Sequence, residues 1–419
     1  MDRPKQNRVA VLSVMRGAEE EDMLRVHASV PYVSTLQHGT YPYVMQLVNR
    51  QFSDAVAETL LTLQIDFTSA RQFGSPRLTD FEPQAIINPS KVVGKTPPYR
   101  RRLAKAASQI TQTLPLDRII DFLFALEDQI DLVQIFTDLP QIPWDWMYSH
   151  DRDKFLCELF GIGTTMPEEE RLSNILFSTH DRALSLADLR SPRYSALVVG
   201  NSYIGTQQAL PGIEESADQI ASLTKPIFGK NNCIVLKDAT AHEVCRAIQE
   251  HAGNLRLIVF CGHFTRFGFR CVDRYFGAVD VQQSLAGQSA DEFGAQPIVI
   301  LNGCKSGDIG CENLASYAEP NRDFVNAASN RNLASAILRH GADACVFTSA
   351  RVRVTFASEF LREMIAKLLS AGVTLGEALC HARRQLDQGK CYEWATYHLL
   401  GDPTYTMVAL GEDTPTQPA

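Results

Sequence analysis

A histidine and a cysteine that each follow an apolar run are the residues of this sequence best suited to chemistry. His263 lies three positions after a run that ends at Phe260, and Cys304 lies three positions after a run that ends at Leu301. A thiol attacks a carbonyl carbon as the thiolate, and a neighbouring imidazole can take up its proton. The pair therefore predicts nucleophilic catalysis by Cys304, with His263 as the acid and base.

The spacing of the two residues suits neighbouring strands of one parallel sheet. They are 41 positions apart, which is enough for one helical crossover. The carboxyl ends of parallel strands meet at one edge of a sheet, where functional sites form. Gly262 and Gly303 precede the two residues directly, and Gly307 follows Cys304. These small residues leave room for a substrate backbone and for N–H groups that hold an oxyanion.

Each residue also has an ordinary structural explanation. A lone histidine at a strand end is often only a hydrogen-bonded structural residue. A lone cysteine after an apolar strand is usually a small buried hydrophobe, and we expect this of Cys233, Cys261 and Cys345. The occurrence of Gly-His and Gly-Cys at two strand ends of one sheet favours the catalytic interpretation.

The elements that must position this pair form a regular pattern after residue 192. Short apolar runs predict strands at 195–200, 233–236, 255–260, 297–301, 344–348 and 395–400. Helical patterns lie at 213–223, 241–251, 333–340, 358–369 and 375–385. Apolar strands that alternate with helices predict an α/β fold, with a mostly parallel sheet that is flanked by helices on both faces.

The chain before residue 192 is less regular, and its N-terminal region has a fold that the sequence does not specify. The runs 9–12 and 61–67 favour strands, 81–102 has the composition of a linker, and 103–133 has a helical pattern. We expect four parts: an N-terminal region with a regulatory or docking role (1–95), a helical lead-in with a Pro- and Trp-rich turn (96–190), a catalytic core (191–410) and a disordered tail (411–419).

Composition excludes several classes of function. The 419 residues carry 40 basic and 48 acidic side chains, and a net charge of -8 disfavours nucleic acid as a partner. No early apolar leader and no run of about eighteen apolar residues is present, so we expect a cytoplasmic protein without a membrane partner. The ten cysteines form no Cys-x-x-Cys pair, and no phosphate-binding glycine loop follows a strand. We therefore expect no metal and no other cofactor.

Several segments, in order along the chain, resemble the motifs of one family. They are the turn 139–148, Leu-Pro-Gly-Ile-Glu-Glu-Ser-Ala at 210–217, the runs 258–263 and 298–304, the helix 333–342, Leu-Gly-Glu-Ala-Leu at 375–379, Ala-Arg at 382–383, and the ending 394–403. Together they resemble the CHAT domain family, caspase-like cysteine peptidases of the clan that includes caspases and separases. The resemblance implies a caspase-like sheet and cleavage of peptide bonds.

Carried onto this sequence, the resemblance implies that Cys304 forms an acyl-enzyme and that His263 transfers the protons. The backbone N–H groups of Cys304 and Phe264 would hold the oxyanion. The family has glycine directly after the histidine, and Phe264 departs from that pattern because its side chain restricts the backbone and adds bulk to the cleft. A catalytically inactive caspase-like interaction module is therefore the main alternative, and a small-ligand sensor is a weaker one.

The resemblance also suggests how substrates are bound. Ser349 and Arg351 follow a predicted strand and would line the primary side-chain pocket, where Arg351 would favour an acidic or strongly polar substrate residue. The polar stretch 307–331 would be a mobile loop that orders on activation. Partners implied by the family are a protein substrate, such as a gasdermin-like or other effector protein, and a regulatory protein. The implied setting is bacterial regulated proteolysis or antiviral defence.

Overall fold

The computed structural model describes fifteen segments of the chain. They are residues 9–16, 24–29, 40–43, 104, 107–108, 117–137, 144–165, 183–206, 209–265, 267–286, 293–303, 306, 333–349, 352–386 and 393–409. Outside the described residues lie Cys304, Arg351, the stretches 61–67, 81–102 and 307–331, and the tail 411–419. Among the described helices, none is long and apolar enough to cross a membrane.

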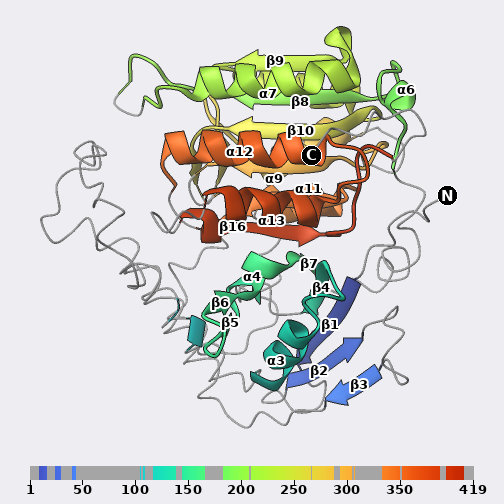
Figure 1. Cartoon of the computed structure of the whole chain (residues 1–419). Helices are drawn as coiled ribbons and strands as arrows, with labels where there is room; N and C mark the ends of the chain where they lie inside the picture. Colours follow the sequence, from blue (N-terminus) through green and yellow to red (C-terminus); the bar gives the residue numbers. More distant parts are fainter. Residues whose placement is uncertain are drawn as a thin grey trace, which may run out of the picture.

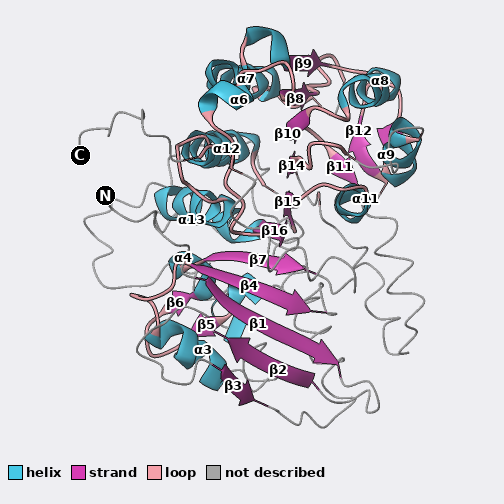
Figure 2. Cartoon of the chain, turned by 90° about the vertical axis from the view of Figure 1, so that its right-hand side faces the viewer, coloured by secondary structure: helices cyan, strands magenta, loops and turns pink. Residues whose placement is uncertain are grey.

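One mostly parallel sheet runs through the molecule (Figures 1 and 2). Its strands, in spatial order, are β3 (Thr40–Tyr43), β2 (Leu24–Ser29), β1 (Val9–Arg16), β4 (Leu132–Thr137), β7 (Gly161–Thr165), β16 (Tyr397–Gly401), β15 (Ala344–Thr348), β14 (Ile298–Asn302), β10 (Leu255–Cys261), β8 (Ser195–Gly200) and β9 (Cys233–Lys237). The antiparallel pairs are β3/β2, β2/β1 and β16/β15. The other neighbouring pairs are parallel.

Helices cover both faces of the half of the sheet from β16 to β9, as Figure 2 shows. On one face lie α7 (Ile213–Phe228), α12 (Val354–Leu368) and α13 (Leu375–Leu386); on the other lie α8 (Ala241–His251), α9 (Ala278–Leu285) and α11 (Leu333–Arg339). Alternate strand residues serve the two layers: Ala196 and Val198 belong to the first core cluster, Leu197 and Val199 to the second. The predicted α/β architecture is confirmed, because apolar strands buried on both faces need two helical layers.

Smaller elements complete the described chain. They are the helices α3 (Asp117–Ala125), α4 (Leu156–Leu159) and α6 (Leu186–Leu189), the 3-10 turns at Trp144–Trp146, Lys230–Asn232 and Glu393–Thr396, the pair β5 (Tyr148–Ser149) and β6 (Lys154–Phe155), and the small sheet β11 (Phe264–Thr265), β12 (Gly268–Arg270) and β13 (Tyr275–Phe276). The small sheet carries the chain onward from the end of β10.

Helix starts follow the capping residues of the sequence. Thr240 precedes α8, where its hydroxyl accepts from the Glu243 N–H at 3.2 Å and the Glu243 carboxylate accepts from the Thr240 N–H at 2.8 Å. Thr374 and Glu377 make the same pair of bonds at the start of α13. These reciprocal bonds explain why α8 and α13 begin at the positions that the sequence pattern predicts.

The helical prediction for 103–133 is wrong at its C-terminal end. The chain is helical in α3, and Leu132 and Val133 then begin β4 instead of ending a helix. All six residues of β4 are buried between two parallel neighbours, so the strand is apolar on both faces and lacks the alternation that marks a half-exposed strand.

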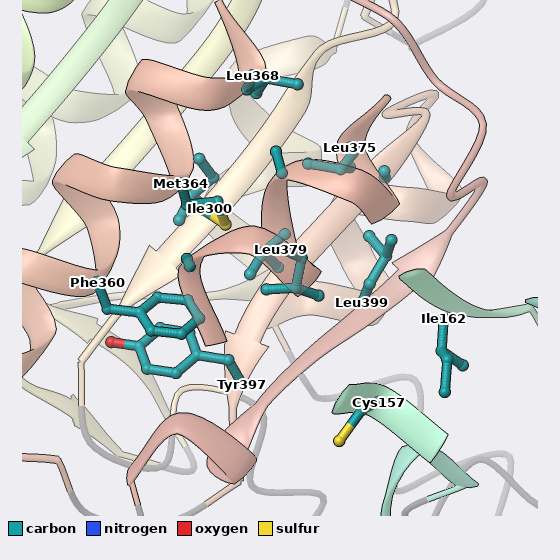
Figure 3. Packing of buried hydrophobic residues seen from close by; sticks show 14 of the residues in the cluster. Cys157, Ile162, Ile300, Phe360, Met364, Leu368, Leu375, Leu379, Tyr397 and Leu399 are labelled. Carbon is teal, nitrogen blue, oxygen red and sulfur yellow. The ribbon is translucent and has the colours of Figure 1, made fainter. Parts of the chain in front are cut away.

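Packing between the sheet and α12 helps to fix the position of the end of β14 (Figure 3). The rings of Phe360 in α12 and Tyr397 in β16 stack with their centroids 3.8 Å apart. The Tyr397 hydroxyl donates to Asn302 Oδ1 at 2.7 Å, and the Asn302 amide donates to the Ala357 carbonyl at 3.2 Å. Asn302 is the last residue of β14, so this network ties the end of β14 to β16 and α12.

Candidate active site

Two neighbouring strands end side by side at the carboxyl edge of the sheet. β10 and β14 run parallel, and their last paired residues are Cys261 and Asn302. Gly262 and Gly303 follow these residues, and His263 follows Gly262 with its side chain half-buried. Cys304 follows Gly303 in the sequence and lies outside the described residues. The described chain therefore brings His263 to the same edge as the residue that precedes Cys304.

The two glycines allow this close approach. A Cβ atom on Gly303 would lie 2.1 Å from the Gly262 carbonyl oxygen and 2.6 Å from Cδ2 of Phe264. Gly262 has a φ of +156°, and its N–H donates to the Asn302 carbonyl at 3.3 Å. Gly303 thus contacts both residues that flank His263. Any larger residue at Gly303 would separate the two strand ends.

His263 is held through its backbone and against a tyrosine ring. Its carbonyl accepts from the Arg270 N–H at 2.9 Å, and its imidazole lies 5.1 Å from the Tyr203 ring, measured between centroids. The Tyr203 hydroxyl donates to the Arg270 carbonyl, and burial raises the pKa of this phenol. The Arg270 guanidinium lies 5.6 Å from the centre of the same ring. The small sheet and Tyr203 together orient His263.

Phe264 lies in a strand with its ring buried. It pairs with Phe269 of β12, and the two ring centroids are 5.2 Å apart. Because the Arg270 N–H donates to the His263 carbonyl, Phe264 and Phe269 form a non-hydrogen-bonded pair, which directs the Phe264 N–H away from β12. The side chain of Phe264 is therefore part of the core next to Gly303, while its N–H lies outside the β11–β12 ladder.

None of the cysteines among the described residues is suited to act as a thiolate. Burial raises the pKa of every one of them: Cys157, Cys233, Cys245, Cys261, Cys271, Cys345 and Cys380. For Cys261, two residues before His263, the pKa is raised to about 12. Cys261 and Cys345 are fully buried, which confirms the expectation for these two, whereas Cys233 is half-buried beside the Thr224 hydroxyl.

A second polar cluster, which was not predicted from the sequence, lies beside this edge. His398 Nδ1 lies 2.8 Å and 3.0 Å from the two carboxylate oxygens of Asp145, and its Nε2 lies 2.7 Å from the Ser349 hydroxyl. The guanidinium of Arg383 donates to Asp145 Oδ2 at 2.7 Å. We call Asp145, Arg383, His398 and Ser349 the relay cluster. Of these four residues, Ser349 alone was predicted from the sequence as a site residue.

The carboxylate of the relay cluster is ionised. Burial alone would raise the pKa of Asp145, but the electrostatic interaction and hydrogen bond with His398 and the charge of Arg383 lower it below its ordinary value of 3.8. Asp145 is 5% exposed and Arg383 is 1% exposed. Charged residues within otherwise apolar segments, Trp144-Asp145-Trp146 and Tyr397-His398-Leu399, were the signal that could have indicated this cluster.

Comparisons with known proteins agree with this architecture. A family model described as "CHAT domain" matches residues 128–402. Separase in the Saccharomyces cerevisiae separase–securin complex has a TM-score of 0.54 at 10% identity, with 95% of this chain and 30% of that chain covered. The "Arg specific cysteine proteinase gingipain R" has a TM-score of 0.49 at 15% identity, with 70% and 68% covered. A search of curated proteins gave no match. The caspase-like fold predicted from the sequence is confirmed.

Proposed function

We infer the function of this chain from its family, because the chain belongs to the CHAT domain family. Its fold is that of caspase-like cysteine peptidases, which supports a hydrolase acting on peptide bonds. We propose that it is a cysteine endopeptidase that cleaves a partner protein, with Cys304 as the nucleophile and His263 as the acid and base. The observation that supports this most is the contact of Gly303, which precedes Cys304, with both residues that flank His263.

In the proposed reaction, His263 takes the proton of the Cys304 thiol and the sulfur attacks the substrate carbonyl carbon. The C–S bond forms, the carbonyl oxygen becomes an oxyanion, and the N–H groups of Phe264 and Cys304 stabilise it. The C–N bond then breaks, and the amine leaves with the proton held by His263. Water, deprotonated by His263, hydrolyses the thioester and regenerates the thiol.

The proposal predicts that one thiol of the native protein reacts much faster than the others. Alkylation with iodoacetamide, followed by peptide mass spectrometry, would measure the rate for each cysteine. We expect Cys304 to react first, since burial raises the pKa of every described thiol. His263→Ala should slow Cys304 selectively, and His242→Ala, at an exposed histidine of α8, is the matched control.

Cleavage itself is tested on the proteins encoded beside this gene. We expect wild type to cut one of them and both Cys304→Ala and His263→Ala to lose the cut. A Cys304 that reacts no faster than the buried thiols, together with no cleavage, would contradict the proposal and favour a non-catalytic interaction module.

A further inference from the structure

Ser349 lies at the strand end next to the one that leads to Cys304. It follows Thr348, the last residue of β15, and β15 pairs with β14. The Thr348 hydroxyl donates to the Gly303 carbonyl, and the Thr348 N–H donates to the Ser306 hydroxyl at 2.9 Å. These bonds fix the end of β15 against the residues on both sides of Cys304 in the sequence. Ser349, half-buried, is therefore close to the proposed reaction centre.

The relay cluster fixes the direction of the Ser349 hydroxyl bond. Asp145 is ionised and accepts hydrogen bonds, so the ring nitrogen that faces it, His398 Nδ1, carries a hydrogen. Arg383 already supplies the cation that balances this carboxylate, so the proposed arrangement has a neutral imidazole, in which Nε2 has no hydrogen and accepts one from Ser349 at 2.7 Å. The rings of Trp146 and Phe347 lie 5.8 Å and 5.6 Å from the His398 ring and hold it in this orientation.

A serine hydroxyl has one hydrogen, and in Ser349 this hydrogen is donated to His398. Among the described residues, a second acceptor near Ser349 Oγ is the Thr396 carbonyl, which lies at the longer distance of 3.4 Å and already accepts from the Ser349 N–H. The hydrogen therefore goes to His398 Nε2, and what remains for a third partner is the oxygen lone pairs. Ser349 therefore differs from an ordinary surface serine, which rotates to donate or to accept.

We propose that Ser349 acts only as a hydrogen-bond acceptor in the substrate pocket, so that the pocket selects a side chain that donates, an amide or a cation, over a carboxylate. This inference rests on the proposed peptidase function and deepens it. Asp145 and Arg383 have opposite charges and are paired, so the cluster favours donors without requiring a positive charge. Asp145 and His398 act through Ser349 and are positioning residues.

The cluster also has the order of a Ser–His–Asp catalytic triad, and two observations favour positioning over nucleophilic activation. Arg383 shares the carboxylate, which weakens the support that Asp145 could give to a protonated His398. The N–H of Ser349 donates to the Thr396 carbonyl at 2.9 Å, so it does not provide the oxyanion contact that a nucleophilic serine often supplies from its own backbone.

The proposal opposes the expectation that Arg351 favours an acidic substrate residue, and the two separate cleanly on a matched pair of side chains. Glutamine and glutamate have nearly the same shape, but glutamine donates hydrogen bonds and glutamate only accepts them. A carboxylate facing an acceptor oxygen leaves both groups unsatisfied. The difference in affinity between peptides that differ by this one replacement therefore tests whether the Ser349 hydroxyl acts only as an acceptor.

The experiment measures binding to the full-length Cys304→Ala variant, so it needs no turnover. Hexapeptides in which Gln replaces Glu at each position in turn are titrated by fluorescence anisotropy. At one position we expect Gln to bind about tenfold more tightly than Glu. His398→Leu releases the serine hydrogen and should bring that ratio close to one, as should Ser349→Ala. Thermal unfolding of each variant checks that it is folded, and His381→Leu is the control at a half-buried histidine of α13.

Three results would overturn the proposal: equal binding of Gln and Glu peptides at every position, tighter binding of Glu, or no peptide binding. Labelling of Ser349 by a fluorophosphonate would overturn it as well, because it would show a nucleophile. A Gln preference in a protein whose Cys304 is unreactive would support the pocket and contradict the peptidase function, so the two proposals fail separately.

Discussion

Two histidines lie at the same edge of the sheet and are held in opposite ways. His263 follows β10 and is held through its backbone carbonyl and by contact with the Tyr203 ring, with its side chain half-buried. His398 is the second residue of β16 and is 8% exposed. One of its ring nitrogens is hydrogen-bonded to Asp145 and the other to Ser349. The first arrangement suits proton transfer to a substrate, and the second suits fixing a neighbouring side chain.

The difference shows why burial matters more than residue type for assigning a role. A buried, doubly hydrogen-bonded imidazole cannot exchange partners without breaking a bond that the interior does not replace. An imidazole at a partly exposed strand end is in reach of water, which can compensate for a change of hydrogen-bond partner. Replacement of each histidine should therefore affect different properties.

The largest effect should come from the first histidine. His263→Ala should lower cleavage by about 10²- to 10⁴-fold, the usual contribution of a general acid and base. The free energy of unfolding should change little, because the side chain is half-buried. Kinetics on a cleaved substrate, with urea unfolding of the same sample, would measure both. If His263→Ala were less stable but kept its activity per folded molecule, His263 would have a structural role and not a catalytic one.

The next largest effect should be on stability, at the relay cluster. Arg383→Met leaves the Asp145 carboxylate buried without its cation, and breaking a buried ion pair in this way costs about 3 to 5 kcal/mol of unfolding free energy. Arg384→Met, at the exposed neighbour on α13, is the matched control and should cost far less. Equal midpoints for the two variants in urea would show that the pair contributes nothing to stability.

Phe264→Gly should lower stability without raising activity. The substitution restores the family's residue after His263, but it removes a ring that is 7% exposed and packs on Phe269 and Gly303. Deleting a buried phenylalanine side chain costs about 3 kcal/mol or somewhat more. Urea unfolding and the Cys304 alkylation rate would measure the outcome. Faster alkylation in a less stable protein would instead show that Phe264 restrains the catalytic residues.

The dependence of stability on acidic pH tests whether Asp145, the partner of His398, is ionised. The pKa of Asp145 is lower in the folded protein than its ordinary 3.8, so ionised Asp145 stabilises the fold above that pH, and the contribution is lost as pH falls through the lowered value. Asp145→Asn should therefore be less stable than wild type at neutral pH, and the gap should close below pH 3.8. Denaturation at a series of pH values tests this, and a constant gap would show that the carboxylate is not ionised.

Local patterns predicted the fold well where the signal lies within one segment. The runs at 195–200 and 255–260 became β8 and β10 because parallel strands are apolar throughout, and α8 begins after its capping threonine. The same reasoning placed His263 at a strand end. It failed at Leu132 and Val133, because a short strand buried on both faces has the apolar content of a helix.

The relay cluster could not be derived in the same way. Its four members come from a turn, a strand end, a helix and another strand, at positions 145, 349, 383 and 398. The pairing of β16 with β15 brings together only Ser349 and His398, and Asp145 and Arg383 join them through tertiary packing. No spacing rule within one element links such residues. What the sequence does contain is the cost of burying Asp145 and Arg383 among apolar neighbours, which requires that each has a partner.

The smallest effect should come from Cys261, the thiol closest in sequence to His263. Its side chain belongs to the first core cluster and is fully buried, and the pKa of its thiol is raised to about 12. A reagent therefore cannot reach the sulfur, and the thiolate is not formed at neutral pH. Cys261→Ala should keep full cleavage activity and lose on the order of 1 kcal/mol of unfolding free energy, as expected for a small truncation in a packed core. Activity and urea unfolding of this variant, beside Cys304→Ala, would measure the difference between a buried and a reactive thiol. If Cys261→Ala abolished cleavage while the protein stayed folded, the nucleophile would have to be reassigned to the strand that carries the histidine.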